Sequence, residues 1–264
     1  MPTQDAAIGV FDSGVGGLSV LREVRAVLPA ESLYYVADSG AAPYGDRPSE
    51  FILERAQAII EFFLDRRAKA IVVACNTVTA VAIQSLRKRY PVPMIAIEPA
   101  LKPAAAQSRS GVIGILATSQ TLASENFSRL SEKYGQGVRV LAQACPGLVE
   151  QVEKGELDGD ATRALVAGYL APLLAEGADT IVLGCTHYPF LLSLIRAAAG
   201  AGVAVIDPAQ AVARELRRRL EAAGLLCVAD APGTDCFWSS GTPHEVAPVM
   251  AKLWGRQITV HQLP

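Results

Sequence analysis

The sequence predicts an α/β protein made of two similar doubly wound domains, with its functional site in the cleft between them. Three observations support this prediction. Strand-like apolar runs alternate with helix-like segments along the chain, a run that contains a cysteine occurs twice, and polar residues follow the strands at equivalent points. Alternating strands and helices are typical of a parallel sheet covered by helices on both faces.

The expected strands are short runs rich in valine, isoleucine and leucine. They lack clean alternation of apolar and polar residues, as expected of parallel strands buried on both faces. In chain order the strands are 6–11, 32–37, 70–74, 92–97, 111–116, 139–142, 180–184, 203–206 and 236–239. Amphipathic stretches that predict helices include 50–67, 78–89, 121–133, 190–199 and 211–223.

Composition narrows the class of protein. The 264 residues are 51% hydrophobic and 19% charged, which favours compact domains over disorder. A net charge of −2 provides no general attraction to nucleic acid or to an anionic membrane. The apolar runs are too short to span a bilayer, and the N-terminal stretch lacks the pattern of a signal peptide. The five cysteines show no close pairing, which is typical of free thiols in a reducing compartment, so we expect a cytoplasmic protein.

The internal repeat is the strongest architectural signal. Residues 70–77 (AIVVACNT) resemble residues 180–187 (TIVLGCTH), with the two cysteines in register. Two further matches occur in the same order: residues 8–13 resemble 113–118, and residues 97–100 resemble 206–209. Three matched landmarks in one order indicate two related halves, and their wide spacing excludes a short-period solenoid.

The repeat also predicts the domain boundaries. We expect a first domain of residues 1–97 and a second domain of residues 98–207. The remaining residues, 208–264, contain a helix and a strand and are expected to return to the first domain. Asp12 and Cys75 then belong to the first domain, and Thr118, Glu153 and Cys185 to the second.

Cys75 and Cys185 follow equivalent strands, and ligands of open parallel sheets bind beyond the carboxyl ends of the strands. Facing halves would therefore place one thiol on each side of a cleft. Inverting a tetrahedral carbon requires one group that removes a proton and another that delivers a proton to the opposite face. A thiol can do both, because its pKa of about 8.5 can be lowered by a helix N-terminus or an imidazolium. A free cysteine is more often only a small buried hydrophobe, and we assign that role to Cys145, Cys227 and Cys236.

The residues next to the two thiols differ. His187 follows Cys185 closely, so we expect the imidazole to assist that thiol, and we expect Asp12 to assist Cys75 from a neighbouring strand end. Cys185 and His187 could also hold a metal, but no compact set of further ligands completes such a site. The glycine-rich turn after Asp12 does not have dinucleotide-binding spacing, and with Ser13 it is better suited to anchor a carboxylate or an ammonium group.

Four motifs together resemble the glutamate racemases of the aspartate/glutamate racemase superfamily: residues 11–18 (FDSGVGGL), 43–45 (PYG), 74–77 (ACNT) and 184–189 (GCTHYP). The resemblance extends over nearly the whole chain. It implies interconversion of L- and D-glutamate for peptidoglycan synthesis, without pyridoxal phosphate, metal or other cofactor. Glutamate is then the small-molecule partner, a homodimer is compatible with the family, and neither nucleic acid nor membrane is involved.

The resemblance also implies roles for individual residues. Cys75 would deprotonate the D-enantiomer and Cys185 the L-enantiomer, assisted by Asp12, Glu153 and His187, although Glu150 lies close enough in sequence to be mistaken for Glu153. The implied substrate-binding residues are Asp12, Ser13, Tyr44, Gly45, Asn76, Thr77, Thr118, Thr121, Thr186 and His187. The run that begins at Asp38 is less typical of the family, which leaves the role of Asp38 open.

Two alternatives remain at this point. The related aspartate racemases share the paired cysteines, although the His-Tyr-Pro ending of the second motif favours glutamate. A non-catalytic amino-acid binding protein would also have two α/β lobes around a cleft. Such a protein needs export and has no use for matched thiols.

Overall fold

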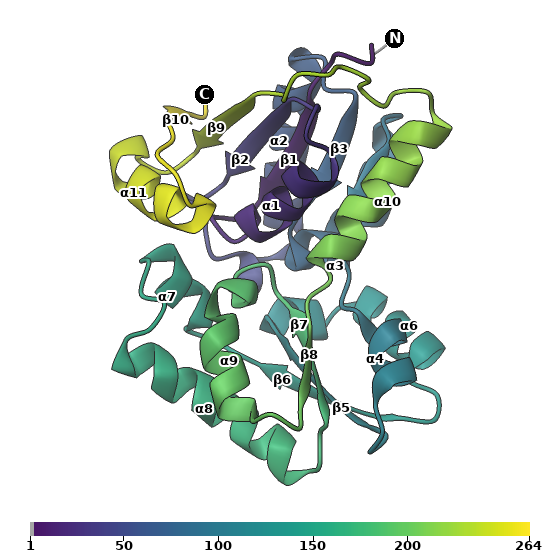
Figure 1. The fold of residues 1–264 in the computed structure, drawn as a ribbon, viewed down its shortest axis with the longest axis vertical. Helices are drawn as coiled ribbons and strands as arrows, with labels where there is room; N and C mark the ends of the chain where they lie inside the picture. Colours follow the sequence, from purple (N-terminus) through teal and green to yellow (C-terminus); the bar gives the residue numbers. More distant parts are fainter. Residues whose placement is uncertain (1–2) are drawn as a thin grey trace.

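The computed structural model describes residues 3–264 and contains two parallel sheets, each covered by helices (Figure 1). The six-stranded sheet has the order β10-β9-β2-β1-β3-β4, and the four-stranded sheet has the order β6-β5-β7-β8. The predicted α/β class with two doubly wound units is confirmed. The first sheet contains β1 (Ile8–Asp12), β2 (Leu33–Ala37), β3 (Ala70–Val73), β4 (Met94–Ala96), β9 (Asp235–Ser239) and β10 (Val260–Gln262). The second contains β5 (Val112–Ala117), β6 (Arg139–Ala144), β7 (Thr180–Gly184) and β8 (Ala204–Ile206).

Helices cover both faces of each sheet. On the six-stranded sheet, α1 (Leu18–Val27) packs against α10 (Ala209–Ala222) and α11 (Pro243–Trp254), while α2 (Ser49–Asp65) packs against α3 (Asn76–Arg89). On the four-stranded sheet, α8 (Asp160–Ala175) packs against α9 (Leu192–Ala199), and α4 (Leu101–Gln107) packs against α6 (Glu125–Tyr134). The short elements η1 (Tyr44–Asp46), α5 (Ser119–Leu122), α7 (Leu148–Glu153) and η2 (Tyr188–Leu191) follow strand ends or connect the longer helices.

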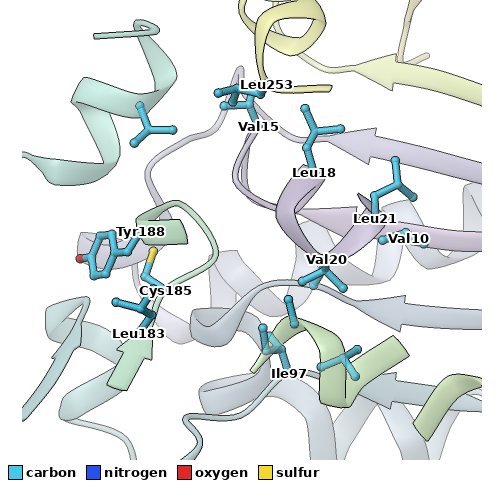
Figure 2. Packing of buried hydrophobic residues seen from close by; sticks show 14 of the residues in the cluster. Val10, Val15, Leu18, Val20, Leu21, Ile97, Leu183, Cys185, Tyr188 and Leu253 are labelled. Carbon is cyan, nitrogen blue, oxygen red and sulfur yellow. The ribbon is translucent and has the colours of Figure 1, made fainter. Parts of the chain in front are cut away.

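Alternate residues of the buried strands face opposite helix layers, which explains why the strand sequences are apolar throughout. Val10 belongs to the core beneath α1, whereas its neighbour Phe11 packs in the separate core beneath α2 and α3. The core beneath α1 continues into the four-stranded sheet. Figure 2 shows Leu183, Cys185 and Tyr188 in the same cluster as Val15 and other residues of the six-stranded sheet's layer. The two sheets are therefore joined by apolar packing as well as by the chain.

The sequence repeat reappears in the strand registers. β1 lies between β2 and β3, and β5 lies in the same way between β6 and β7. Ile8 pairs with Ala70, and the equivalent Ile113 pairs with Thr180. The third sequence match does not follow the register: Val182 faces Ile206, whereas the equivalent Val72 faces Ile95.

The six-stranded sheet uses strands from both ends of the chain, whereas the four-stranded sheet lies between them in sequence. On this basis we propose the division into residues 1–97 plus 208–264 and residues 98–207. None of the helices within residues 3–264 combines the length and the apolar character needed to cross a membrane.

Two local predictions need correction. The helix expected over 121–133 is two helices, α5 and α6, because the Ser124 side chain accepts a hydrogen bond from the Phe127 amide at 3.1 Å and begins a new helix there. β10 was missed because it is a short edge strand with two exposed residues, His261 and Gln262, and so has no apolar run.

Candidate active site

The carboxyl ends of the central strands of both sheets meet around one small cavity. Asp12 ends β1, Cys75 follows β3, Thr118 follows β5 and Cys185 follows β7. Both cysteines line the cavity, one from each sheet, as the repeat predicted. The lining residues are Ser13, Pro43, Tyr44, Gly45, Cys75, Asn76, Thr77, Thr118, Val149, Cys185, Thr186 and His187. Because a substrate carbon between the thiols needs a proton-transfer contact to each of them, we expect the two sulfurs to lie roughly 7–8 Å apart.

Cys75 lies at the start of α3, and its thiol is 3.7 Å from the Ser13 hydroxyl. Burial and the nearby Asp12 carboxylate raise the pKa of this thiol well above its ordinary range. The Val78 amide at the helix N-terminus acts in the opposite direction but is outweighed. The lowering of a thiol pKa that a helix N-terminus can produce is therefore not found at Cys75, and its thiol form is favoured.

Cys185 has an imidazole beside it. Its Sγ lies 3.7 Å from His187 Nδ1, and His187 Nε2 lies 2.6 Å from Glu153 Oε1. Burial opposes the charged imidazole, but the hydrogen bonds to Cys185 and Glu153 outweigh it, and the pKa of His187 is raised well above its ordinary value. An imidazolium in contact with sulfur stabilises a thiolate, so this end of the cavity differs chemically from the Cys75 end.

Glu153 connects the two sheets. Its Oε1 also accepts a hydrogen bond from the Val15 amide at 2.7 Å, and its Oε2 accepts one from the Ser39 hydroxyl at 3.3 Å. A Cβ at Gly14 would overlap Glu153 Oε1, so a larger residue there would displace this carboxylate. Glu150 has none of these contacts among the described residues, so Glu153 is the glutamate held at the site.

Asp12 is fully buried behind the cavity. Its Oδ2 accepts hydrogen bonds from the Gly17 amide at 2.8 Å and from the Thr186 hydroxyl at 3.3 Å. Its Oδ1 has no hydrogen-bond partner among residues 3–264. Burial raises the pKa of Asp12, and the charge of His187 partly offsets this effect. The assistance that Asp12 is expected to give Cys75 stays a prediction.

Hydroxyl and amide groups also line the cavity. Thr118 Oγ1 lies 3.0 Å from Thr77 Oγ1 and 2.9 Å from Thr121 Oγ1. Neither polar atom of the buried Asn76 side chain has a partner within the described residues. Buried polar atoms without partners are costly, so Asn76 and Asp12 are sites where a polar ligand would be satisfied. Thr121 and Asp12 stand behind the lining residues, whereas every other expected substrate-binding residue lines the cavity.

Two neighbouring side chains hold Asp38 in place. Its buried carboxylate accepts hydrogen bonds from the Tyr44 hydroxyl and from Arg55, whose Nε and Nη2 lie 2.9 Å and 2.5 Å from its two oxygens. Arg55 comes from α2, outside the cavity, whereas Tyr44 is part of its wall.

Sequence reasoning missed several residues around the cavity. Pro43 and Val149 line it, Ser39 contacts Glu153, and Arg55 contacts Asp38. The proximity of Pro43 to Tyr44 in the sequence was an available signal, but no local pattern marks Val149 or Arg55. Across residues 3–264 no three metal-ligating side chains of histidine, cysteine, aspartate or glutamate are grouped in a way that could hold an ion.

Comparison with known proteins identifies the family. The family model for Asp/Glu/hydantoin racemases matches residues 8–216. The chain belongs to the Asp/Glu/hydantoin racemase family. Within this family it is 56% identical to the glutamate racemase of Methylococcus capsulatus over 264 residues, which covers 100% of this chain and 97% of that protein.

Solved structures of racemases agree over the full length. The glutamate racemase isoform RacE1 from Bacillus anthracis superposes with a TM-score of 0.90 at 34% identity, covering 99% of this chain and 98% of that one. The Escherichia coli glutamate racemase, solved in complex with L-glutamate, gives a TM-score of 0.85 at 30% identity, covering 97% of this chain and 98% of that one. Sequence and fold therefore both relate this chain to glutamate racemases.

Proposed function

We propose that this racemase interconverts L- and D-glutamate with Cys75 and Cys185 as the two acid–base groups, and so supplies D-glutamate for peptidoglycan. The observation that carries the proposal is that two cysteines, equivalent in the repeat, line one cavity from opposite sheets. A substrate carbon between them could lose a proton to one and gain a proton from the other.

In the direction from L to D, the Cys185 thiolate removes the α-proton of L-glutamate. The electron pair left on the α-carbon is shared with the α-carboxylate, and the Cys75 thiol then donates its proton to the opposite face. The enzyme ends with a Cys185 thiol and a Cys75 thiolate. The raised pKa of Cys75 and the raised pKa of His187 suit this direction, because Cys75 begins as the acid and Cys185 begins beside an imidazolium.

In the direction from D to L, Cys75 must act as the base, and Asp12 is the nearby carboxyl group whose charge acts on it. Asp12, with its raised pKa, can take up the thiol proton before the substrate is attacked. Its unpartnered Oδ1 can also accept a hydrogen bond from the substrate ammonium group, and the unpartnered Asn76 amide can donate one to a substrate carboxylate. Both roles are our assignments from geometry.

The test is circular dichroism of L-glutamate and L-aspartate incubated with the purified protein without added cofactor. Decay of the glutamate signal to zero, with aspartate unchanged, supports the proposal. Decay of the aspartate signal alone would identify an aspartate racemase. Tight binding of an amino acid without decay of its signal would identify a binding protein. Activity that is lost on dialysis against a chelator and restored by a metal would contradict a cofactor-independent mechanism, as would a Schiff-base absorbance band.

Two further features of the proposal need separate measurements. A homodimer is consistent with the family, and light scattering of the purified protein would test it. A cytoplasmic location is supported by the five cysteines, which are all free thiols in the structure. Fractionation of cells that express the protein would test this location.

A further inference from the structure

One wall of the cavity depends on a buried ion pair that does not itself reach the cavity. Asp38 directly follows β2 and its side chain is 0% exposed, while Arg55 on α2 has a side chain that is 32% exposed. Two guanidinium nitrogens hold the two carboxylate oxygens in a forked pair. A carboxylate this deeply buried needs such partners, so Arg55 holds Asp38 in place.

Asp38 in turn holds Tyr44, which is part of the cavity wall. The Tyr44 hydroxyl donates its hydrogen bond to Asp38, and the ring is buried against Phe51 with the two ring centroids 6.2 Å apart. Burial and the Asp38 charge raise the pKa of Tyr44, so the phenol keeps its proton for this hydrogen bond. The orientation of Tyr44 is thereby tied to α2.

Residues 44–47 also contact the domain that contains the second sheet. A Cβ at Gly45 would come within 3.2 Å of Thr118 Cβ, which means that the backbone lies closely against the second sheet's strand end. The carbonyl of Arg47 accepts a hydrogen bond from Gln120 Nε2 at 2.9 Å. Displacing Tyr44 would therefore open the cavity where the two sheets meet.

We propose that Arg55 is a positioning residue for racemisation, acting through Asp38 to hold Tyr44 and Gly45 as the closed wall of the substrate cavity. The inference rests on the proposed racemase function. The polar contacts of both thiols come from outside this wall, because Cys75 contacts Ser13 and Cys185 contacts His187. A loosened wall weakens binding of substrate and transition state alike, so KM rises for both enantiomers while both kcat values stay close to the parent values.

The experiment compares Arg55→Ala, Arg55→Lys and Asp38→Asn with the parent enzyme in both directions. We expect Arg55→Ala to raise both KM values by roughly tenfold, the scale of the loss of one hydrogen bond to the substrate. Arg55→Lys should lie between Arg55→Ala and the parent, because it keeps the charge but loses the fork. Because Arg55 is partly exposed, added methylguanidinium should enter the gap left by Arg55→Ala and lower KM again.

Arg47→Ala is the matched control. It also removes an exposed arginine, but the guanidinium of Arg47 lies over the Phe51 ring and not beside Asp38. It should leave KM unchanged. The inference would be overturned if Arg55→Ala kept the KM values of the parent enzyme, or if only its kcat fell. It would also be overturned if KM rose in Arg55→Ala and was lowered neither by methylguanidinium nor in Arg55→Lys. If Arg55→Ala fails to fold, Arg55→Lys and Asp38→Asn decide the question. An inactive parent would instead contradict the proposed function.

Discussion

The strands that precede the two cysteines, β3 and β7, pair with β1 and β5 in equivalent registers but differ in the residues at both of their ends. At the carboxyl ends, Cys75 is followed by Asn76, whereas Cys185 is followed by Thr186 and His187. At the amino ends, the equivalent positions are Lys69 and Asp179, which have opposite charges. The repeat therefore preserved the backbone that positions two thiols, while the side chains around each thiol diverged.

This difference suits a racemase. The scaffold must place two groups symmetrically about one carbon, but one group must start as an acid while the other starts as a base. The buried Cys75, with its raised pKa, and Cys185 beside His187 satisfy that requirement at equivalent backbone positions. Four predictions test how far the equivalence and the divergence extend.

The largest effect is expected from the thiols themselves. Cys75→Ala and Cys185→Ala should each lower kcat for glutamate racemisation by about 10³-fold or more, because each removes an acid–base group that no neighbour replaces. Cys145→Ala is the matched control: this thiol is also buried and follows β6, but it does not line the cavity. Circular dichroism measures all three. Comparable losses from Cys145→Ala and Cys185→Ala would contradict the assignment.

The amino end of β3 should control stability more than activity. Lys69 is 0% exposed and pairs with Glu31 at 2.5 Å, so Lys69→Met leaves a buried carboxylate without its cation. We expect a loss of about 3–5 kcal/mol in the free energy of unfolding. Lys69→Met combined with Glu31→Leu should recover much of it, because no charge is then left buried. Urea denaturation measures both, and an equal loss in the double variant would refute this account.

The carboxyl end of β7 should control the direction of proton transfer. His187→Asn removes the imidazole from Cys185, so we expect kcat from L to D to fall by about 10- to 100-fold and kcat from D to L to fall less. The ratio kcat/KM must fall equally in both directions, because the equilibrium between enantiomers cannot change. The α-deuterium isotope effect in each direction is the informative measurement. Unchanged isotope effects and kcat values would mean that His187 is only structural.

The smallest effect is expected at the amino end of β7. Burial disfavours the charged Asp179, but hydrogen bonds from the Ser108 hydroxyl and the amides of Ser110 and Arg109 outweigh it and lower its pKa. This stabilisation is fully present above the unfolded pKa of about 3.9 and is lost as pH falls toward the lower folded value. Asp179→Asn should cost about 1 kcal/mol at neutral pH and progressively less in acid. Thermal unfolding at several pH values tests this, and a pH-independent difference would contradict it.

The sequence by itself determined the layers of the fold and the position of both thiols. Apolar runs identify strands because a parallel strand must be buried on both faces, and the matched runs around Cys75 and Cys185 are enough to establish that the two thiols are equivalent. His187, Asp12 and the threonines were found for the same reason: they lie next to strand ends, where local sequence order becomes proximity in space. The third match, at Ile97 and Ile206, is not reproduced in the strand register. The two pairings differ by a shift of two residues, which keeps each side chain on the same face of the sheet.

Only the tertiary structure decided which distant residues meet. Glu153 reaches Val15, Arg55 reaches Asp38, and Lys69 is buried against Glu31. A charged residue on a helix normally lies in solvent, and nothing in its local pattern reveals that a carboxylate from another element faces it. These contacts depend on how the helices pack over each sheet and how one sheet faces the other. The Arg55–Asp38 and Lys69–Glu31 contacts need the first domain to be folded, because they join segments far apart in its sequence, and the Glu153–Val15 contact needs both domains to be folded and in place.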